Sequence, residues 1–315
     1  MSVVLYGVTA AFFNGLLVGS LYGLMALGLT LIYRVTKIPN FAFAEYITYG
    51  AYAAVAASFF IDPSSRALLF ASGLLLSIGV GALIALASDE LVFKPLWKRG
   101  SEVLQLLVAS IGVGLVLRYS LLGVAALTGG KYLEVRFPIT YETLFSIGGL
   151  ASVTTAHVLA ITSMILFAIS LHLLFTRTRL GKAMRATASN PTLARITGIN
   201  IMMVRRITWI IAGGLASFAG FTYSYYNPVN PESGWITLLW IFAAAIMGGF
   251  TFYGVLFSGL ILGIAENVVG FLANYYLNVG SEYNPVIALA TLVVVLMFKP
   301  EGLLRMESLA VARRV

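Results

Sequence analysis

The sequence predicts an all-α membrane protein with about eight or nine transmembrane or re-entrant helices. The chain of 315 residues is 60% hydrophobic and only 10% charged, and its mean hydropathy is +0.94. Soluble domains are about a quarter charged, so this chain has too little polar surface to cover a soluble core. Long apolar runs recur along the whole sequence, and they do not alternate as the strands of a β-barrel do.

Nine apolar stretches account for the predicted helices. They cover residues 5–33, 38–61, 67–88, 103–127, 147–175, 207–226, 235–249, 252–277 and 285–298. The seventh is short and ends in Gly248-Gly249, so a full span, a half-span and a re-entrant segment all remain open for it. No appended soluble domain is visible, and we expect a single transmembrane domain over residues 1–315.

The distribution of basic residues predicts the orientation of the chain. If the N-terminus lies outside and each stretch crosses once, sixteen of the 20 Lys and Arg residues fall on the cytoplasmic side, including Arg305, Arg313 and Arg314. Three fall outside, and Arg118 stays within a span. Because cytoplasmic loops are enriched in Lys and Arg, we expect a cell-membrane protein with its N-terminus outside and its C-terminus in the cytoplasm. The net charge of +8 then reflects this orientation and contact with membrane lipids, and it predicts no binding of nucleic acid.

A polar, basic block at residues 176–206 interrupts the apolar sequence. It holds seven Lys and Arg residues, and no Asp or Glu occurs between Glu142 and Glu232. Within it, "SNPTLARITGI" has the signals of a short helix. Ser189 or Asn190 can cap the helix, and Pro191 suits its first position.

The end of this short helix and its apolar face are also predicted. Gly198 can close the helix in the left-handed conformation. Leu193 and Ile196 share one face, which needs a partner. A helix that lies on the membrane surface would show a broader apolar face with aromatic anchors, so we expect a protein groove as the partner. The alternative is a loop that lipid phosphates hold.

Signatures of catalysis are missing from the sequence. The "RLGKA" segment lacks the upstream Gly and the Ser or Thr of a Walker A motif, so this chain is not expected to bind ATP or Mg²⁺ through it. Neither a zinc-protease motif nor a nucleophile elbow occurs. The chain has no Cys and two His residues far apart in sequence, which predicts no metal site. We therefore expect a protein that is not an enzyme and carries no cofactor of its own.

The motifs resemble the permease subunits of branched-chain amino acid ABC importers. "RATASNPTLARITGIN" is similar to the cytoplasmic coupling segment of that family. The segment from Gly19 to Tyr52, with Asn40-Phe41-Ala42, resembles its first two spans, and Phe93 to Arg118 its loop and fourth span. "FAAAIMGGF", "GLILGIAENV" and the terminal "KPEGLL" extend the resemblance over nearly the whole chain.

The sequence departs from the family in a few places. Phe43-Ala44 stands where the family often has His-Gly, and Ser189 or Asn190 replaces an acidic residue of the coupling segment. Gly248-Gly249 opens a run that differs from the family's glycine-rich pattern. These departures leave the fold expectation unchanged but weaken a simple transfer of substrate specificity.

The resemblance implies an ABC importer permease architecture and a set of partners. These are two ATPase subunits that bind ATP and Mg²⁺, a second permease subunit, identical or paralogous, and an extracytoplasmic solute-binding protein. The implied substrates are branched-chain or other hydrophobic amino acids. The alternatives are urea or short amides within the same family, or a secondary transporter driven by an ion gradient. The residues implied to couple this chain to the ATPases are Gly181, Lys182, Arg185, Ala186, Asn190, Pro191, Ala194, Arg195 and Gly198.

Polar groups and helix breaks inside the spans are costly, and they are the other candidates for function. The candidates for the translocation pathway are Asn40, Phe43, Glu45, Arg118, Gly248, Gly249 and Glu266. Three hypotheses remain open for Glu266: it forms a buried ion pair with Arg118, it is a hydrogen-bonded carboxylic acid with a structural role, or it lines the pathway. For Glu45 and Arg118, too, a structural role as a buried ion pair or a hydrogen-bonded carboxylic acid is the alternative to a role in transport.

Overall fold

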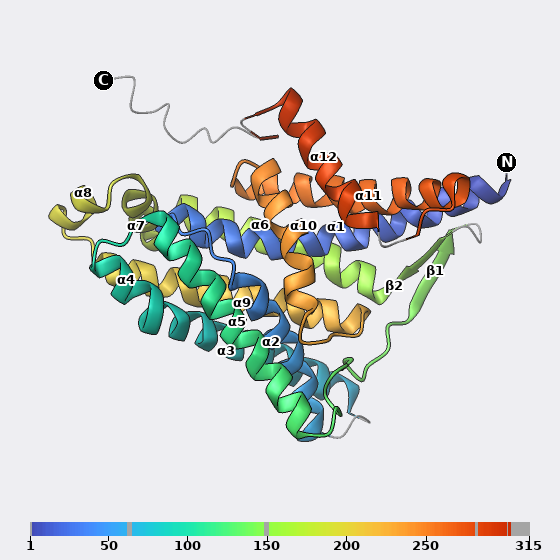
Figure 1. The fold of residues 1–315 in the computed structure, drawn as a ribbon, viewed down its shortest axis with the longest axis horizontal. Helices are drawn as coiled ribbons and strands as arrows, with labels where there is room; N and C mark the ends of the chain where they lie inside the picture. The colour runs from blue at the N-terminus through green and yellow to red at the C-terminus, as the bar shows by residue number, and fades with distance from the viewer. Residues whose placement is uncertain (1, 62–64, 148–150, 281–282, 301, 304–315) are drawn as a thin grey trace. The chain divides into compact units, whose positions relative to one another are not determined.

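The computed structural model describes residues 2–61, 65–147, 151–280, 283–300 and 302–303, so Arg305, Arg313 and Arg314 lie outside the described residues. Each of the nine predicted stretches contains a helix (Figure 1). These helices are α1 (Ser2–Thr36), α2 (Phe43–Ala56), α3 (Arg66–Ser88), α5 (Val103–Leu127), α6 (Thr155–Arg177), α9 (Ile201–Tyr226), α10 (Ser233–Met247), α11 (Phe252–Leu277) and α12 (Asn284–Phe298).

Shorter helical pieces complete the α-helical part. A 3-10 turn, Ala57–Phe59, follows α2, and a π-helical segment, Asp89–Phe93, joins α3 to α4 (Lys94–Lys98). The basic block folds into α7 (Arg179–Ser189) and α8 (Pro191–Ile196).

Six of the helices are long and apolar enough to cross a membrane. In contrast, α10 and α12 have 15 residues each, which at about 1.5 Å per residue is shorter than the roughly 30 Å hydrocarbon core. The seventh predicted stretch is therefore a short helix.

A β-hairpin is the exception to the expected all-α fold in the described part of the chain. Strands β1 (Thr143–Ile147) and β2 (Ala151–Thr154) pair antiparallel, with Thr143 opposite Thr154. The predicted apolar stretch 147–175 was wrong at its beginning, because a short apolar run does not distinguish a strand from a buried helix.

The chain divides into two compact units. The first unit comprises Met1–Thr30, Thr143–Ile169 and Leu239–Val315, and the second comprises Leu31–Glu142 and Ser170–Leu238. In each unit, segments that are far apart in the sequence pack together.

Glycines bring the backbones of α1 and α11 together in the first unit. A Cβ added to Gly19 would lie 2.7 Å from the carbonyl oxygen of Gly259, and one added to Gly263 would lie 2.2 Å from the amide nitrogen of Gly19. Only glycine permits this approach. The small residues therefore serve close packing of the two helices, as is common in membrane proteins.

Helices α2, α3 and α9 form the core of the second unit around Ser217. The buried hydroxyl of Ser77 donates to the Ser217 carbonyl at 2.6 Å, and the Ser217 hydroxyl donates to the Tyr46 carbonyl at 2.8 Å. A Cβ on Gly50 would lie 2.3 Å from the α-carbon of Ser217. These contacts join three helices into one tightly packed group.

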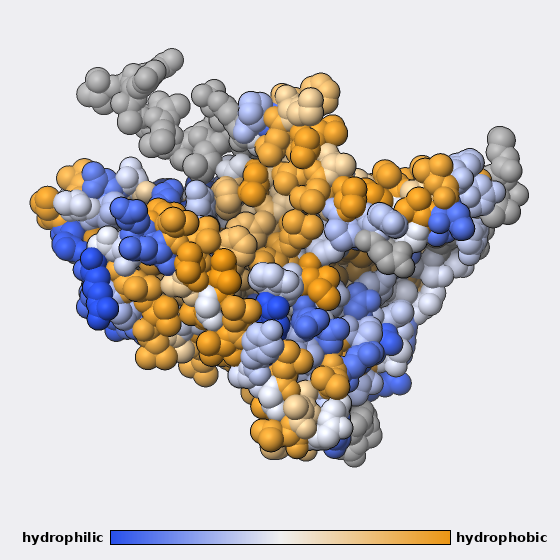
Figure 2. Space-filling view, in the orientation of Figure 1, coloured by the Kyte–Doolittle hydropathy of each residue, from blue (hydrophilic) through white to orange (hydrophobic). Residues whose placement is uncertain are grey.

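The outer face of the second unit is apolar over α3 and α5 (Figure 2). Leu75, Leu83 and Val116 are 69%, 67% and 71% exposed. An apolar surface of this extent would be a liability in water, whereas it suits lipid.

Candidate functional site

The coupling segment, residues 176–206, folds as its local signals predict. The Thr178 hydroxyl accepts a hydrogen bond from the amide of Gly181 at 2.9 Å and caps α7. Asn190 caps α8 through a 3.0 Å bond from the amide of Leu193. Gly198 has φ +85°, so it closes the segment in the left-handed conformation. Of the two predicted caps, Asn190 is correct.

The outward surface of the coupling segment combines cations with apolar side chains. Lys182, Arg185 and Arg195 are exposed, and Leu193 and Ile196 are 58% and 77% exposed. The expected apolar face is thus present and is not covered within the described part of the chain.

Two of the predicted coupling residues face inward. A Cβ on Gly181 would lie 2.0 Å from the Leu174 carbonyl oxygen, so α7 packs directly on the end of α6. Ala194 is also buried. These residues position the segment. The other predicted members, Ala186, Asn190, Pro191 and Gly198, are half-buried or exposed.

A buried ion pair holds the start of α9, at the end of the coupling segment. The Arg205 guanidinium donates to Asp89 from Nε at 2.8 and 2.9 Å and from Nη2 at 2.5 Å. The side chains are 5% and 0% exposed. Next to it, Glu90 pairs with Arg206 and Lys94. The sequence analysis did not identify Asp89 and Glu90. The signal was that the basic block contains no Asp or Glu, so its buried cations need carboxylates from another part of the chain.

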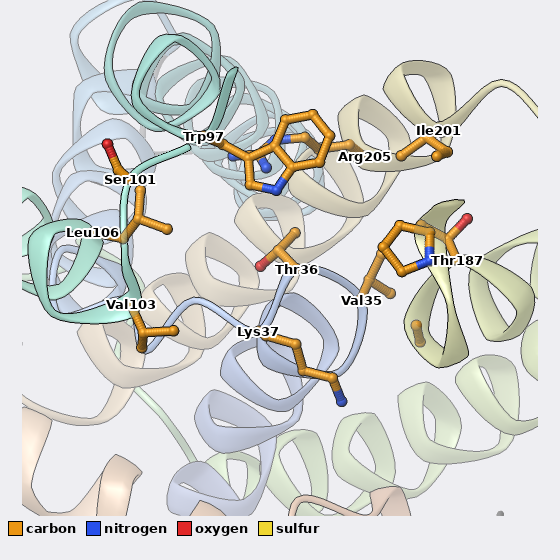
Figure 3. Close-up of a pocket in the computed structure, with 12 residues that line it drawn as sticks. Val35, Thr36, Lys37, Trp97, Ser101, Val103, Leu106, Thr187, Ile201 and Arg205 are labelled. Carbon is orange, nitrogen blue, oxygen red and sulfur yellow. The ribbon is translucent and has the colours of Figure 1, made fainter. Parts of the chain in front are cut away.

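A cavity of about 270 Å³ lies behind the coupling helices. Its wall is formed by the end of α1, α4, the start of α5, α7, α8 and the start of α9. Figure 3 shows the Trp97 indole beside Arg205 on one side, with Lys37 from the end of α1 on another. Burial and the nearby Arg34 guanidinium hold the pKa of Lys37 below its usual value. Neither Lys37 nor Trp97 was predicted.

The chain between α1 and α2 breaks the helical pattern at residues 37–42. Some backbone groups in this break lack helical hydrogen bonds, and two of them bond to Ser110 of α5. The Ser110 hydroxyl accepts from the Phe41 amide at 3.0 Å and lies 3.3 Å from the Pro39 carbonyl oxygen. Asn40 is buried and donates to the Tyr46 hydroxyl at 3.4 Å. Phe43 is fully buried and packs inside the second unit.

A second buried ion pair lies just after this break. Arg118 Nε donates to Glu45 Oε1 at 3.3 Å, and the side chains are 10% and 1% exposed. The Trp235 ring covers the guanidinium, with 4.3 Å from Cζ to the ring centroid. Among the described residues, Glu45 Oε2 and Arg118 Nη2 have no hydrogen-bond partner.

Glu266 accepts hydrogen bonds from neutral donors and is not paired with Arg118. The Tyr22 hydroxyl donates to its Oε2 at 2.9 Å, and the Asn284 amide donates to its Oε1 at 3.3 Å. The hypothesis of a Glu266–Arg118 pair is therefore wrong, because Arg118 is paired with Glu45. Glu266 instead joins α1, α11 and α12 of the first unit through neutral donors.

The Gly248-Gly249 break is a tight turn between α10 and α11. Gly249 and Phe250 have φ of +60° and +51°, and Thr251 caps α11 by accepting from Gly254 at 3.1 Å. The terminal motif packs here, because the Leu303 amide donates to the Met247 carbonyl at 2.7 Å. Two motifs that lie far apart in the sequence thus meet at one turn.

Comparison with known proteins places the chain in a family. Residues 11–296 match the family described as the branched-chain amino acid transport system permease component. The probable branched-chain amino acid transport permease protein LivH of Methanocaldococcus jannaschii is 34% identical, over 92% of this chain and 90% of that protein. The high-affinity branched-chain amino acid permease protein LivH of Salmonella typhimurium is 30% identical, over 93% of this chain and 94% of that protein. The high-affinity branched-chain amino acid permease protein BraD of Pseudomonas aeruginosa is 29% identical, over 92% of this chain and 94% of that protein.

These relatives are transport permeases, and the matches cover almost the full length of both proteins in each comparison. The apolar helices agree with a multi-pass membrane protein. The chain therefore belongs to the family of permease components of branched-chain amino acid transport systems, and it is a transport subunit of an ABC importer, not an enzyme.

Proposed function

We propose that this chain is the permease of an ATP-driven importer for branched-chain or other hydrophobic amino acids. In this proposal, two ATPase subunits bind ATP and Mg²⁺, a second permease subunit completes the pathway, and an extracytoplasmic solute-binding protein delivers the substrate. The family membership and the names of the relatives support it. They do not favour a transporter driven by an ion gradient.

The observation that carries the coupling part of the proposal is the surface of α7 and α8. Its exposed cations and the exposed Leu193 and Ile196 offer charge and apolar area to a partner. The Asp89–Arg205 pair joins the start of α9, which follows this surface in the chain, to the segment after α3. In this proposal, a movement of α7 and α8 therefore also moves the packed group of α2, α3 and α9.

Co-purification with the ATPase tests this surface. We expect Leu193→Asp with Ile196→Asp, or Arg185→Glu with Ala186→Glu, to weaken ATPase binding at least about tenfold, because apolar contacts and complementary charge are lost. Arg99→Glu is the matched control, since Arg99 is exposed in another loop. ATPase binding that is unchanged in both double variants would refute the coupling role.

The orientation is part of the same proposal, with the N-terminus outside and the C-terminus in the cytoplasm. The chain has no Cys, so single introduced cysteines report the side of the membrane. We expect Asn190→Cys to be labelled only from the cytoplasm and Glu232→Cys only from outside. Both positions are exposed, whereas the neighbouring Ser233 is buried and would label poorly. Labelling of both from one side of intact cells would contradict this orientation.

Transport in proteoliposomes tests the substrate class and the energy source. With the partner subunits and the binding protein present, we expect leucine uptake that requires ATP and persists when ion gradients are collapsed. Uptake of urea or a short amide in place of leucine would favour the alternative substrate class. Uptake without ATP would refute the proposed energy source.

A further inference from the structure

We infer that Glu45 and Arg118 form a binding site for the ammonium and carboxylate groups of a zwitterionic amino acid, with Trp235 as its cover. The inference rests on the proposed function, because it assigns a chemical role to one place in that transport pathway. It concerns only the second unit, in which α2, α5 and the start of α10 supply the three side chains.

The Glu45–Arg118 pair is less complete than the other buried pair of the second unit, Asp89–Arg205. One hydrogen bond of 3.3 Å joins the two charges, whereas three bonds of 2.5 to 2.9 Å join Asp89 and Arg205. Glu45 Oε2 and Arg118 Nη2 are buried and lack a partner among the described residues. Buried charged groups that lack hydrogen bonds are destabilising, so their retention calls for a function.

The two unpaired atoms complement the two charged groups of an amino acid. Glu45 Oε2 can accept from an ammonium group, and Arg118 Nη2 can donate to a carboxylate. A zwitterion adds one charge of each sign to a site that already holds one of each, so the low-dielectric interior stays neutral. A substrate with a net charge would leave one charge without a counter-ion, which is costly there.

A partly exposed side chain and an irregular stretch of backbone border the pair. Trp235 is 43% exposed and lies over the guanidinium, so one side of the Arg118 cover is a side chain that reaches the surface of the second unit. Gly114 is one helical turn before Arg118 and packs against the start of α2, because an added Cβ would lie 3.5 Å from Cα of Ala42 and 3.8 Å from Cγ of Glu45. The non-helical residues 37–42 immediately precede Glu45, and irregular backbone at membrane depth is found where protein or a cavity accommodates it.

Uptake and assembly must be measured together to test the site. The variants are Glu45→Gln, Arg118→Gln and the double variant in the complete transporter, reconstituted in proteoliposomes with leucine-loaded binding protein. We expect kcat for leucine uptake to fall at least about tenfold in all three, with the KM for the loaded binding protein unchanged. The double variant has no unpaired charge, so we expect it to recover assembly and thermal stability but not uptake.

The double variant separates a binding site from a structural pair. If it regains uptake together with stability, the pair is structural or the pathway takes an uncharged substrate, and the inference is overturned. Arg118→Lys is the second variant in case the double variant does not assemble: it keeps the charge, and we expect it to retain more uptake than Arg118→Gln. Equal uptake of these two would also overturn the inference.

Controls distinguish this inference from the proposed function. Glu142→Gln removes a carboxylate from the exposed pair with Arg66, and we expect it to leave uptake unchanged. If the unmodified transporter takes up none of leucine, isoleucine, valine and phenylalanine, the proposed function fails and the inference fails with it. If it takes up leucine and the double variant does so equally well, only the inference fails.

Discussion

Two buried ion pairs of the second unit differ in how completely their charges are paired. Asp89 and Arg205 share three hydrogen bonds and have no unsatisfied atom among the buried groups of the described chain. Glu45 and Arg118 share one bond, and each keeps an unpartnered atom. Burial is similar in both, so burial alone does not separate an anchor from a site that exchanges partners. The two kinds of pair are separated by how many of their lone pairs and N–H protons have hydrogen-bond partners.

Loss of the complete pair has the largest expected effect. Asp89→Asn leaves the Arg205 guanidinium buried without a counter-ion, and we expect the free energy of unfolding to fall by about 3–5 kcal/mol. Thermal unfolding of the purified permease in detergent measures this. Glu90→Gln is the matched control, because Glu90 is 28% exposed and its pairs are partly solvated. If Asp89→Asn and Glu90→Gln lower the free energy of unfolding equally, the buried Asp89–Arg205 pair is no stronger than the partly exposed pairs of Glu90.

Loss of the incomplete pair is expected to cost less. Glu45→Gln also leaves a buried guanidinium without its counter-ion, but it removes one hydrogen bond of 3.3 Å where Asp89→Asn disturbs three shorter ones, so we expect a loss of about 1–3 kcal/mol. The variant that also carries Arg118→Gln should be more stable than Glu45→Gln alone, which the same unfolding experiment reports. A loss as large as that of Asp89→Asn would mean that Glu45 is an anchor as well.

Glu266 extends the comparison to a carboxyl group that accepts from neutral donors. Tyr22 and Asn284 donate to it, and the carbonyl of a Gln can accept from either of them. We therefore expect Glu266→Gln to cost less than about 1 kcal/mol and to assemble normally. A measured loss of several times that amount, with Tyr22→Phe as reference for a single lost bond, would show that the group carries a required charge.

The exposed ion pair between Arg66 and Glu142 is expected to contribute least to the free energy of unfolding. Arg66 and Glu142 are 2.8 Å apart, but their side chains are 71% and 68% exposed. Water and salt screen such a pair, so we expect Glu142→Gln to change the free energy of unfolding by less than about 0.5 kcal/mol. A larger change at physiological salt would show that exposure is a poor guide to the strength of ion pairs in this protein.

Local signals were sufficient for the approximate positions of the helices and for the ends of some of them. The predicted stretches 103–127 and 252–277 coincide with α5 and α11, since an apolar run of that length has few alternatives in a membrane. Asn190, Pro191 and Gly198 act within a few residues of their own backbone, so they could be recognised without knowledge of the fold.

Contacts between distant segments could not be predicted in this way. Glu266 and Arg118 were the obvious charges to pair, yet Arg118 bonds to Glu45 and Glu266 bonds to Tyr22, 244 positions away. The hairpin of β1 and β2 was missed for a related reason, because its pairing depends on two strands that meet.

The sequence by itself determined the membrane class, the approximate positions of the helices, the helical structure of the basic block and the family, because hydrophobic length, caps and motifs are properties of neighbouring residues. Only the tertiary structure decided which carboxylate meets which cation. In a low-dielectric interior a charge is stabilised by the partner that packing brings within about 3 Å, and that partner lies 73 positions away for Arg118 and 116 for Arg205.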